Sequence, residues 1–515
     1  MIKRILKAVF SRFAFDCFAL LLQIVFLVAM VLRIGDYRIF AAITILSQVI
    51  GIIAVVYIIN GRSNPGYKIA WITLVLAVPV FGLLVYFGFA RSKFSFFERR
   101  RMQVLNQHLK PPMKKLPDLT GRITETSGEG AARQSAYIRN STYCPPYENT
   151  ETEYFPIGEE MFSAMLADLE AAEHFIFLEY FIIDRGIMWD SILDVLKRKA
   201  AAGVDVRVIY DDVGTIKLLP YGYDKTLREM GIKCRIFNPA IPILSAALNN
   251  RNHRKITVID GHTAYTGGIN LADEYINEKE RFGHWKDSAI RLYGEGVWSF
   301  TLMFLTMWEY WDNSREQYSA YKPAKYMRRI PRAGGYVQPY TDNPLDNEAV
   351  GETVYLNMIN RAERYVYITT PYLVVDNEMI TALTTAAKSG VDVRIVTPGI
   401  PDKWYVHTTS RAYYEVLLEA GVRIYEYTPG FIHAKNFVCD DKYGTVGSIN
   451  LDYRSLYLHF ECGVWLCETS SIAQIKEDFL QILRVSRECT LEETQNVKLP
   501  TRLLRSIMRT FSPLL

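Results

Sequence analysis

Two stretches of the chain place a histidine and a lysine at the same spacing. They read HRKITVIDGHTAYTGGIN at 253–270 and HAKNFVCDDKYGTVGSIN at 433–450. Both follow the pattern His-x-Lys-x4-Asp, then six residues, then Gly, Gly or Ser, Ile and Asn. An imidazole can act as a nucleophile or as an acid and base, and a lysine beside it attracts anions. The pattern therefore favours chemistry on an anionic substrate such as a phosphate ester.

The spacing within each stretch indicates which residues act together. Residues two apart on a β-strand share a face, so each histidine and its lysine point the same way. Asp260 and Asp440 complete the motif but fall on the opposite face, where we expect them to anchor the following loop rather than touch substrate. Asn270 and Asn450 can donate hydrogen bonds to phosphate oxygens.

Duplication suggests that each stretch supplies half of one site. A single His-x-Lys would more simply be a solvated strand edge. If the two copies meet, one imidazole can attack phosphorus to give a phosphohistidine. The other can protonate the leaving alkoxide and then deprotonate the incoming alcohol. Lys255, Lys435 and the two asparagines would stabilise charge on the phosphoryl oxygens, so we expect neither a metal nor another cofactor.

The elements around the two stretches are also duplicated. HFIFLEYFIID at 174–184 and RYVYITTPYLVVD at 364–376 are strand-like, and GVDVR recurs at 203–207 and 390–394. Strands alternating with helical stretches in each half predict an α/β fold. We expect two pseudo-twofold lobes, at 151–335 and 336–497, that share one active site.

The composition excludes several other classes of protein. The net charge of +4 does not indicate strong nucleic-acid binding. The seven cysteines form no C-x-x-C pair, which argues against a disulfide scaffold and a structural zinc site.

The first 92 residues are interpreted as a membrane anchor. Apolar runs occupy 13–32, 39–59 and 69–89, and roughly 20 apolar residues are enough to cross a bilayer. The second and third runs contain no charged residue and predict transmembrane helices. The first contains Asp16 and is either a further span or an interfacial helix.

Basic residues flank both ends of the anchor, which favours the cytoplasm for both ends. Three full spans would instead place the two ends on opposite sides of the membrane. The heavier cluster, which includes Arg99, Arg100 and Arg101, follows the last run. The positive-inside rule therefore predicts a multi-pass protein of the cell membrane with its catalytic part in the cytoplasm.

Two further segments have a distinct composition. Residues 93–150 include Pro111 and Pro112 and predict a linker with little packing of its own. Residues 498–515 place Arg502, Arg505 and Arg509 along one side of a helix. This basic amphipathic pattern favours contact with an anionic membrane, the alternative being a terminal helix packed on the protein.

The two His-x-Lys-x4-Asp stretches match the HKD motif of the phospholipase D superfamily. Four segments, 249–275, 282–292, 369–399 and 430–461, resemble bacterial cardiolipin synthases. The resemblance implies that two phosphatidylglycerol molecules are joined into cardiolipin with release of glycerol. It also implies anionic membrane lipids, rather than nucleic acid, as partners.

The resemblance further implies roles for single residues. The first motif tends to attack in this family, which makes His253 the nucleophile and His433 the acid and base. In related enzymes an acidic residue on the following strand fixes each histidine ring. Asp287 and Glu461 occupy the matching places, so we expect Asp287 to orient His253 and Glu461 to orient His433.

Other carboxylates and other reactions remain open at this level. Glu179 is expected to be a core carboxylate, and Asp211 and Asp212 serve either structure or substrate contact. The same motifs also suit a phospholipase D-type hydrolase that uses water, or another HKD phosphodiesterase or nuclease. The apolar anchor and the modest net charge weigh against a nuclease.

Overall fold

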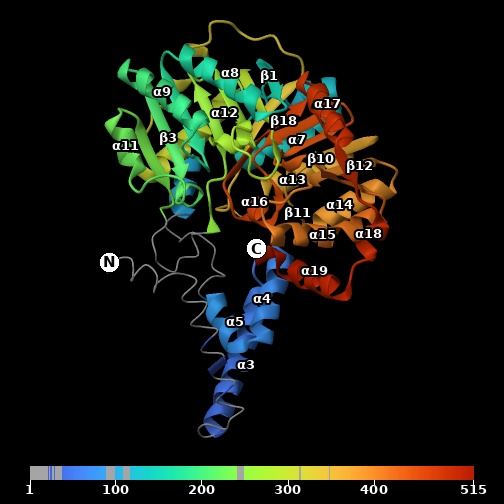
Figure 1. Cartoon of the computed structure of the whole chain (residues 1–515). Helices are drawn as coiled ribbons and strands as arrows, with labels where there is room; N and C mark the ends of the chain where they lie inside the picture. The colour runs from blue at the N-terminus through green and yellow to red at the C-terminus, as the bar shows by residue number, and fades with distance from the viewer. Residues whose placement is uncertain are drawn as a thin grey trace. The chain divides into compact units, whose positions relative to one another are not determined.

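The computed structural model describes residues 21, 24, 25, 28, 37–87, 99–107, 116–239, 249–312, 315–346 and 348–514 (Figure 1). The chain divides into two compact units. One comprises Met1–Ser95, Ala240–Asn250 and Ser506–Leu515, and the other comprises Phe96–Pro239 and Arg251–Arg505. The larger unit contains the duplicated α/β lobes, which confirms the predicted fold class.

The first lobe is built on a seven-stranded sheet in the order β1-β8-β6-β5-β2-β3-β4. Pairing is antiparallel from β1 to β2 and parallel from β2 to β4. The strands are β1 (Thr150–Phe155), β2 (Phe175–Tyr180), β3 (Asp205–Asp211), β4 (Lys233–Phe237), β5 (Lys255–Ile259), β6 (Thr263–Gly267) and β8 (Ala289–Gly294).

The second lobe repeats this topology. Its sheet runs β9-β18-β16-β15-β10-β12-β13, with β19 added beyond β13. The pairing directions match those of the first sheet strand for strand. The strands are β9 (Tyr336–Asp342), β10 (Tyr365–Thr369), β12 (Asp392–Pro398), β13 (Arg423–Tyr427), β15 (Asn436–Cys439), β16 (Tyr443–Gly447), β18 (Glu461–Cys467) and β19 (Ser486–Glu488).

Helices cover the sheets and explain why the central strands read as continuous apolar runs. All six residues of β2 and all five of β10 are buried, because a strand with packed layers on both faces has no solvated side. The covering helices are α8 (Gly158–Ala171), α9 (Ile187–Ala201), α11 (Tyr223–Glu229), α12 (Val297–Asp312), α13 (Val350–Arg361), α14 (Asn377–Lys388), α15 (Trp404–Glu419), α17 (Ser471–Arg484) and α18 (Leu491–Gln495).

Short segments of backbone pair across the seam between the two lobes. Strand β7 (His284–Lys286) of the first lobe runs parallel to β14 (Gly430–Ile432) of the second. Asn252 forms a parallel bridge to Phe460 in the corresponding place. Each pairing joins the segment just before a motif histidine to the segment just before an acidic residue of the other lobe.

The interpretation of 93–150 as a linker with little packing of its own is wrong for its second half. Helix α7 (Thr120–Thr142) lies there and packs against α13 and β9. Its buried side chains include Ile123, Ala131 and Ile138. Gly128, at φ 84°, interrupts the helical backbone. The segment is polar and glycine-rich overall, so its narrow apolar stripe did not indicate a stable helix. Packing of that stripe against α13 and β9 is enough to stabilise the helix.

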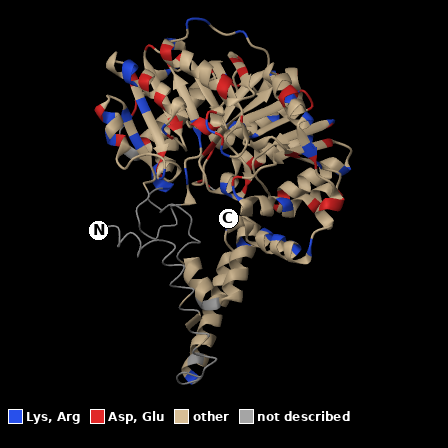
Figure 2. Ribbon diagram, in the orientation of Figure 1, with Lys and Arg blue, Asp and Glu red and all other residues tan. Residues whose placement is uncertain are grey.

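The smaller unit contains the apolar helices of the anchor. Among the described residues, one helix is long and apolar enough to cross a membrane, Ala41–Ile59 within α3 (Tyr37–Ile59). The sequence of α3 contains one charged residue, Arg38, and Figure 2 shows little charge colouring along the helices of this unit. This agrees with the span predicted at 39–59, whereas most of the first apolar run, 13–32, lies outside the described residues.

The third apolar run does not form the single unbroken helix that was predicted, and a multi-pass arrangement is not supported. It is divided into α4 (Pro65–Ala77) and α5 (Pro79–Val85). Val78 between them has non-helical angles, φ −137° and ψ 76°. Pro79 has no backbone N–H to continue the ladder of α4, so a new helix begins at that residue.

The expected C-terminal helix forms as α19 (Leu499–Phe511), followed by a 3-10 turn at Ser512–Leu514. Its contact with a membrane stays a prediction.

Candidate active site

The two motif histidines are buried at the seam, and each is bound by the backbone of the other lobe. The N–H of His253 donates to the carbonyl of Phe460 at 2.9 Å. The N–H of His433 donates to the carbonyl of Lys286 at 2.7 Å. Both residues are 7 % exposed. Residues separated by about 180 positions in the sequence therefore form one site, which neither lobe contains by itself.

The acidic residues that hold the imidazoles are the predicted ones, but their assignment to the two histidines was reversed. His253 Nδ1 lies 2.9 Å from Glu461 Oε1 and 3.1 Å from Oε2. His433 Nδ1 lies 2.7 Å from Asp287 Oδ2. The parallel pairing of β7 with β14 carries Asp287 to His433, and the Asn252–Phe460 bridge carries Glu461 to His253.

The two carboxylates are supported in different ways. Asp287 Oδ1 accepts from the N–H of Ser288 at 2.8 Å. A Cβ at Gly268 would overlap that oxygen, so the second glycine of GGIN leaves room for Asp287. The matching residue in the second lobe is Ser448, whose hydroxyl donates to Glu461, as does that of Ser455. The glycine of GGIN therefore accompanies the shorter acid, Asp287, and the serine of GSIN accompanies the longer acid, Glu461.

The pKa values of the buried groups define the resting protonation of the site. Burial lowers the pKa of His253 to about 3 and that of His433 to about 4. Burial alone would raise the pKa of Glu461, but His253 and Lys255 outweigh it and lower that pKa well below its usual range. The rings are therefore neutral at pH 7. Because each Nδ1 faces a carboxylate, Nε2 is the nitrogen left for chemistry.

The motif lysines lie beside the histidines, as the strand spacing predicts. Lys255 Nζ donates to the carbonyl of His253 at 2.5 Å, and Lys435 Nζ donates to that of His433. Burial lowers their pKa values to about 8 and about 7. The charge of Lys255 also lowers the pKa of His433, so the two motifs share one electrostatic environment.

The motif aspartates lie away from the histidines and hold backbone. The carboxylate of Asp260 accepts from the N–H groups of Glu173, His174 and Phe175, where β2 begins. Asp440 makes the equivalent three contacts at the start of β10. They anchor backbone as expected, but at the start of a neighbouring strand rather than in the loop that follows. As members of the His-x-Lys-x4-Asp motif, Asp260 and Asp440 therefore support the catalytic strands through backbone contacts.

The motif asparagines differ in their surroundings. Asn270 Oδ1 accepts from the N–H of Ile182 at 3.0 Å, and its Nδ2 donates to the hydroxyl of Tyr275 at 2.7 Å. The structure thus gives Asn270 a positioning role. Asn450 Oδ1 is buried and has no hydrogen-bond partner among the described residues. Contact of either amide with phosphate stays a prediction.

Two carboxylates near the first motif prove to be structural. Asp211 caps α10 (Asp212–Thr215) and accepts from the N–H of Asn252 at 2.9 Å. Glu179 is buried, as expected of a core carboxylate, and accepts from Asn252 Nδ2 at 2.7 Å. Both therefore fix the residue that immediately precedes His253.

Sequence reasoning missed the rings that surround the two histidines. His433 contacts Tyr275, Trp285 and Phe431, with ring centroids 5.6, 5.5 and 5.8 Å away. His253 contacts Phe181 at 5.2 Å and His459 at 5.6 Å. The spacing His459-x-Glu461 was the available signal, because residues two apart in an extended segment share a face.

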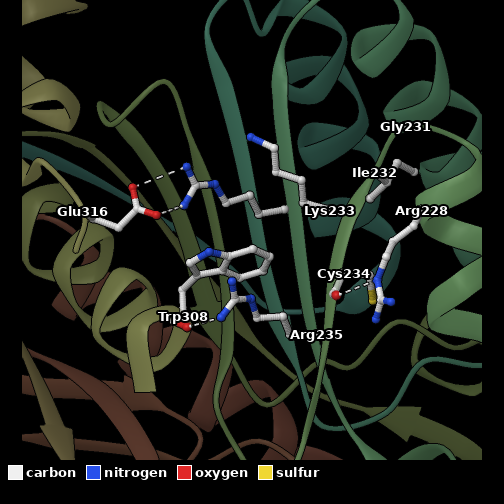
Figure 3. A pocket seen from close by; sticks show the side chains of 9 residues that line it. Arg228, Gly231, Ile232, Lys233, Cys234, Arg235, Trp308 and Glu316 are labelled. Atoms are coloured by element: carbon white, nitrogen blue, oxygen red, sulfur yellow. Dashed lines mark hydrogen bonds and ion pairs between the residues drawn. The ribbon is translucent and has the colours of Figure 1, made fainter. Parts of the chain in front are cut away.

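A groove of about 450 Å³ lies elsewhere on the first lobe, beside edge strand β4 (Figure 3). Arg207 pairs there with Glu316 at 2.6 Å, and Arg235 donates to the carbonyl of Trp308 at 2.8 Å. Burial raises the pKa of the Cys234 thiol, which keeps it protonated. The residues that line the groove are Arg207, Arg228, Gly231, Ile232, Lys233, Cys234, Arg235, Trp308 and Glu316. The groove therefore lacks the activated nucleophile found at the seam.

Comparison with known proteins agrees with this geometry. The family described as "Cardiolipin synthase, PLD-like domain" matches residues 165–283 and 355–483, one segment in each lobe. A cardiolipin synthase of Geobacillus kaustophilus is 36% identical over 90% of this chain and 91% of its own. The chain belongs to the cardiolipin synthase family. This confirms the prediction from the sequence, which was a bacterial cardiolipin synthase of the phospholipase D superfamily.

Other similarities extend over most of the chain. Cardiolipin synthase 2 of Bacillus anthracis is 34% identical over 88% of each chain. An uncharacterized protein of Streptococcus mutans is 44% identical over 90% of this chain and 99% of its own. Residues 49–91 match a family described as "Phospholipase_D-nuclease N-terminal".

A solved structure shows that the fold is shared beyond the cardiolipin synthase family. Phosphatidylserine synthase of Haemophilus influenzae aligns with 74% of this chain and 100% of its own, with a TM-score of 0.53. At 15% identity this likeness concerns the fold alone.

Proposed function

We propose that this member of the family transfers a phosphatidyl group between two phosphatidylglycerol molecules, giving cardiolipin and glycerol. The proposal rests on the two imidazoles at the seam. Each is held through Nδ1 by a buried carboxylate of the other lobe. Two such imidazoles supply a nucleophile and an acid-base group at one phosphodiester.

In the first step, Nε2 of His253 attacks the phosphorus of phosphatidylglycerol. The P–N bond forms while the P–O bond to glycerol breaks, and Nε2–H of His433 protonates the departing alkoxide. Glu461 stabilises the positive charge that develops on the His253 ring, and Lys255 and Lys435 stabilise the phosphoryl oxygens.

In the second step, the free hydroxyl of another phosphatidylglycerol attacks the same phosphorus. His433 accepts the hydroxyl proton, the P–O bond of cardiolipin forms, and the P–N bond to His253 breaks. One phosphodiester replaces another, so the reaction is nearly balanced and reversible.

The acid role requires a proton on His433, whose pKa is low in the free protein because of burial. A phosphodiester anion beside the ring favours the imidazolium form. Asp287 stabilises this form through Nδ1–H, as a buried carboxylate does in other acid-base pairs. Substrate binding therefore raises the pKa of His433 and recruits the proton used in the first step.

The anchor explains why a lipid rather than water accepts the phosphatidyl group. Helix α3 is long and apolar enough to hold the protein at a bilayer, where anionic phosphatidylglycerol is concentrated. We place the catalytic part on the cytoplasmic side, because Arg99, Arg100 and Arg101 follow the apolar helices. Reporter fusions after 101 and at the C-terminus test this orientation, and fluorescence of an extracellular-only reporter would contradict it.

Product analysis tests the proposed reaction. Purified full-length protein in phosphatidylglycerol vesicles should release one glycerol for each cardiolipin, and added glycerol should drive cardiolipin back to phosphatidylglycerol. Phosphatidic acid as the main product, with no effect of glycerol, would identify a phospholipase D-type hydrolase. Cleavage of nucleic acid without lipid turnover would identify an HKD nuclease.

A further inference from the structure

His459 is only partly exposed, and both of its ring nitrogens are buried without a hydrogen-bond partner among the described residues. Its ring centroid lies 5.6 Å from that of His253. Nδ1 lies 3.8 Å from Glu461 Oε1, which is too far for a hydrogen bond but within electrostatic reach. Buried polar atoms normally have a partner, so the position of His459 suggests one that the chain itself does not provide.

His459 lies close to two side chains of types that bind metal ions in proteins. One ligand atom from each of His253, His459 and Glu461 lies within 4.8 Å of the others. Two imidazoles and one carboxylate are a donor set that Zn²⁺ adopts in proteins, with about 2 Å from metal to each ligand. Ligand atoms of such a site lie within about 4 Å of one another, so a small movement of the His459 ring completes it.

The carboxylate in this set is already fixed. The hydroxyls of Ser448 and Ser455 both donate to Glu461, which is fully buried. Ligating carboxylates in metal sites are commonly held by such outer hydrogen bonds. Lys255, whose charge acts on Glu461, opposes a cation here, so we expect moderate rather than very tight binding.

The second half of the active site has no equivalent. The residue two positions before Asp287 is Trp285, and it occupies beside His433 the place that His459 occupies beside His253. An indole supplies no ligand to a divalent metal. A single cation per chain is therefore expected, on the His253 side.

We propose that His253, His459 and Glu461 form a binding site for a transition-metal cation such as Zn²⁺, and that the bound cation inhibits the enzyme. The ring binds as a neutral imidazole: a metal–nitrogen bond forms at Nδ1, the Nδ1–H bond breaks, and Nε2 takes up one proton in exchange, so no net proton is released. With a proton on Nε2 and Glu461 bound to the cation, Nε2 has no lone pair with which to attack phosphorus. The expectation that no metal serves as cofactor is unchanged, since this metal would act as an inhibitor.

Metal binding can be measured independently of the proposed reaction. Untagged full-length protein in detergent is titrated with ZnCl₂ in competition with a chromophoric chelator. Wild type should bind one Zn²⁺, and His459→Asn should weaken the binding at least about tenfold. His174→Asn, which alters an exposed histidine of the first lobe, is the matched control and should bind as wild type does. Equal affinity in wild type and His459→Asn would overturn the proposal.

X-ray absorption of the loaded wild type gives a second test that does not depend on a variant folding. We expect nitrogen and oxygen ligands at about 2.0–2.2 Å and no sulfur shell at about 2.3 Å. A sulfur shell would place the metal on cysteine and refute the site.

Inhibition rests on the proposed function and is measured separately. Zn²⁺ should lower cardiolipin formation by wild type, with half-inhibition at least about tenfold higher for His459→Asn, each variant being referred to its own rate with chelator. Binding without inhibition would leave the site but refute its regulatory role, whereas absence of cardiolipin formation in every variant would refute the proposed function instead.

Discussion

His253 of the first lobe hydrogen-bonds through Nδ1 to Glu461 of the second lobe, at 2.9 Å from Oε1. The bond joins residues 208 positions apart in the sequence. Its pseudo-twofold counterpart joins His433 to Asp287. Each lobe therefore supplies one histidine and the acid that fixes the other lobe's histidine, which makes the lobes mutually dependent.

Neutralising either acid should impair catalysis while leaving substrate binding largely intact. In Glu461→Gln an amide replaces the carboxylate that stabilises the charged His253 ring, so we expect kcat to fall at least about a hundredfold with little change in KM. Asp287→Asn should do the same through His433. Initial rates on phosphatidylglycerol vesicles measure both, with Glu468→Gln, outside the site, as control. A normal kcat in Glu461→Gln would contradict its assigned role.

The two histidines should be separately essential but differ in what they leave behind. His253→Ala and His433→Ala should each reduce cardiolipin formation to background. Mass spectrometry of the His433→Ala protein after incubation with phosphatidylglycerol should find the phosphatidyl adduct on His253. An adduct on His433 in the reciprocal variant, with none on His253, would reverse the assignment of nucleophile and acid.

Exchange of the residue types at Gly268 and Ser448 should impair the enzyme to different degrees. Gly268→Ser introduces a Cβ that overlaps the Asp287 carboxylate, which must move away from His433, so we expect a large loss of kcat. Ser448→Gly removes one hydrogen bond to Glu461 and creates no clash, so its loss should be smaller, about 1.5–3 kcal/mol in transition-state stabilisation. Comparable rates in Gly268→Ser and wild type would contradict the close approach. Circular dichroism controls for folding.

Activity should decline on the alkaline side as the motif lysines lose their protons. Burial lowers the pKa of Lys435 to about 7 and that of Lys255 to about 8. Since the charged ammonium binds phosphate, kcat/KM should fall as the pH rises through 7 to 8. In Lys435→Arg the guanidinium stays charged, so the alkaline decline in kcat/KM should move toward about pH 8, where Lys255 loses its proton. An unchanged pH profile would show that Lys435 does not cause the alkaline decline.

Chelation should not abolish the reaction. The lysines provide the charge stabilisation for which other phosphoryl-transfer enzymes use metal ions. Synthesis in EDTA should therefore equal or exceed that in untreated buffer, the increase coming from removal of inhibitory cation. Loss of activity in EDTA that one divalent ion restores would show that a metal is required.

The duplicated spacing by itself predicted much of this protein. Residues at i and i+2 of a strand share a face, so His253 with Lys255 and His433 with Lys435 could be assigned to one chemistry. The recurrence of GVDVR marked β3 and β12 as equivalent strands, and hence two similar sheets. These inferences depend on local periodicity, which a sequence displays directly.

Tertiary structure alone decided which acid meets which histidine. Asp287 follows the first motif and Glu461 the second, so proximity in the sequence favoured pairing within each lobe. The pairing of β7 with β14 carries Asp287 across the seam to His433, and the Asn252–Phe460 bridge carries Glu461 to His253. Such contacts depend on how two folded surfaces meet, and no short-range spacing encodes that.

The sequence also did not reveal the packing of α7 or the surroundings of His459, because both depend on contacts between distant segments. The packing of α7 depends on α13 and β9, which lie more than 190 residues further along the chain. His459 became notable only when the seam placed it beside His253. The local sequence thus determined the elements and the chemical groups available, while the meeting of the two lobes determined which groups act together.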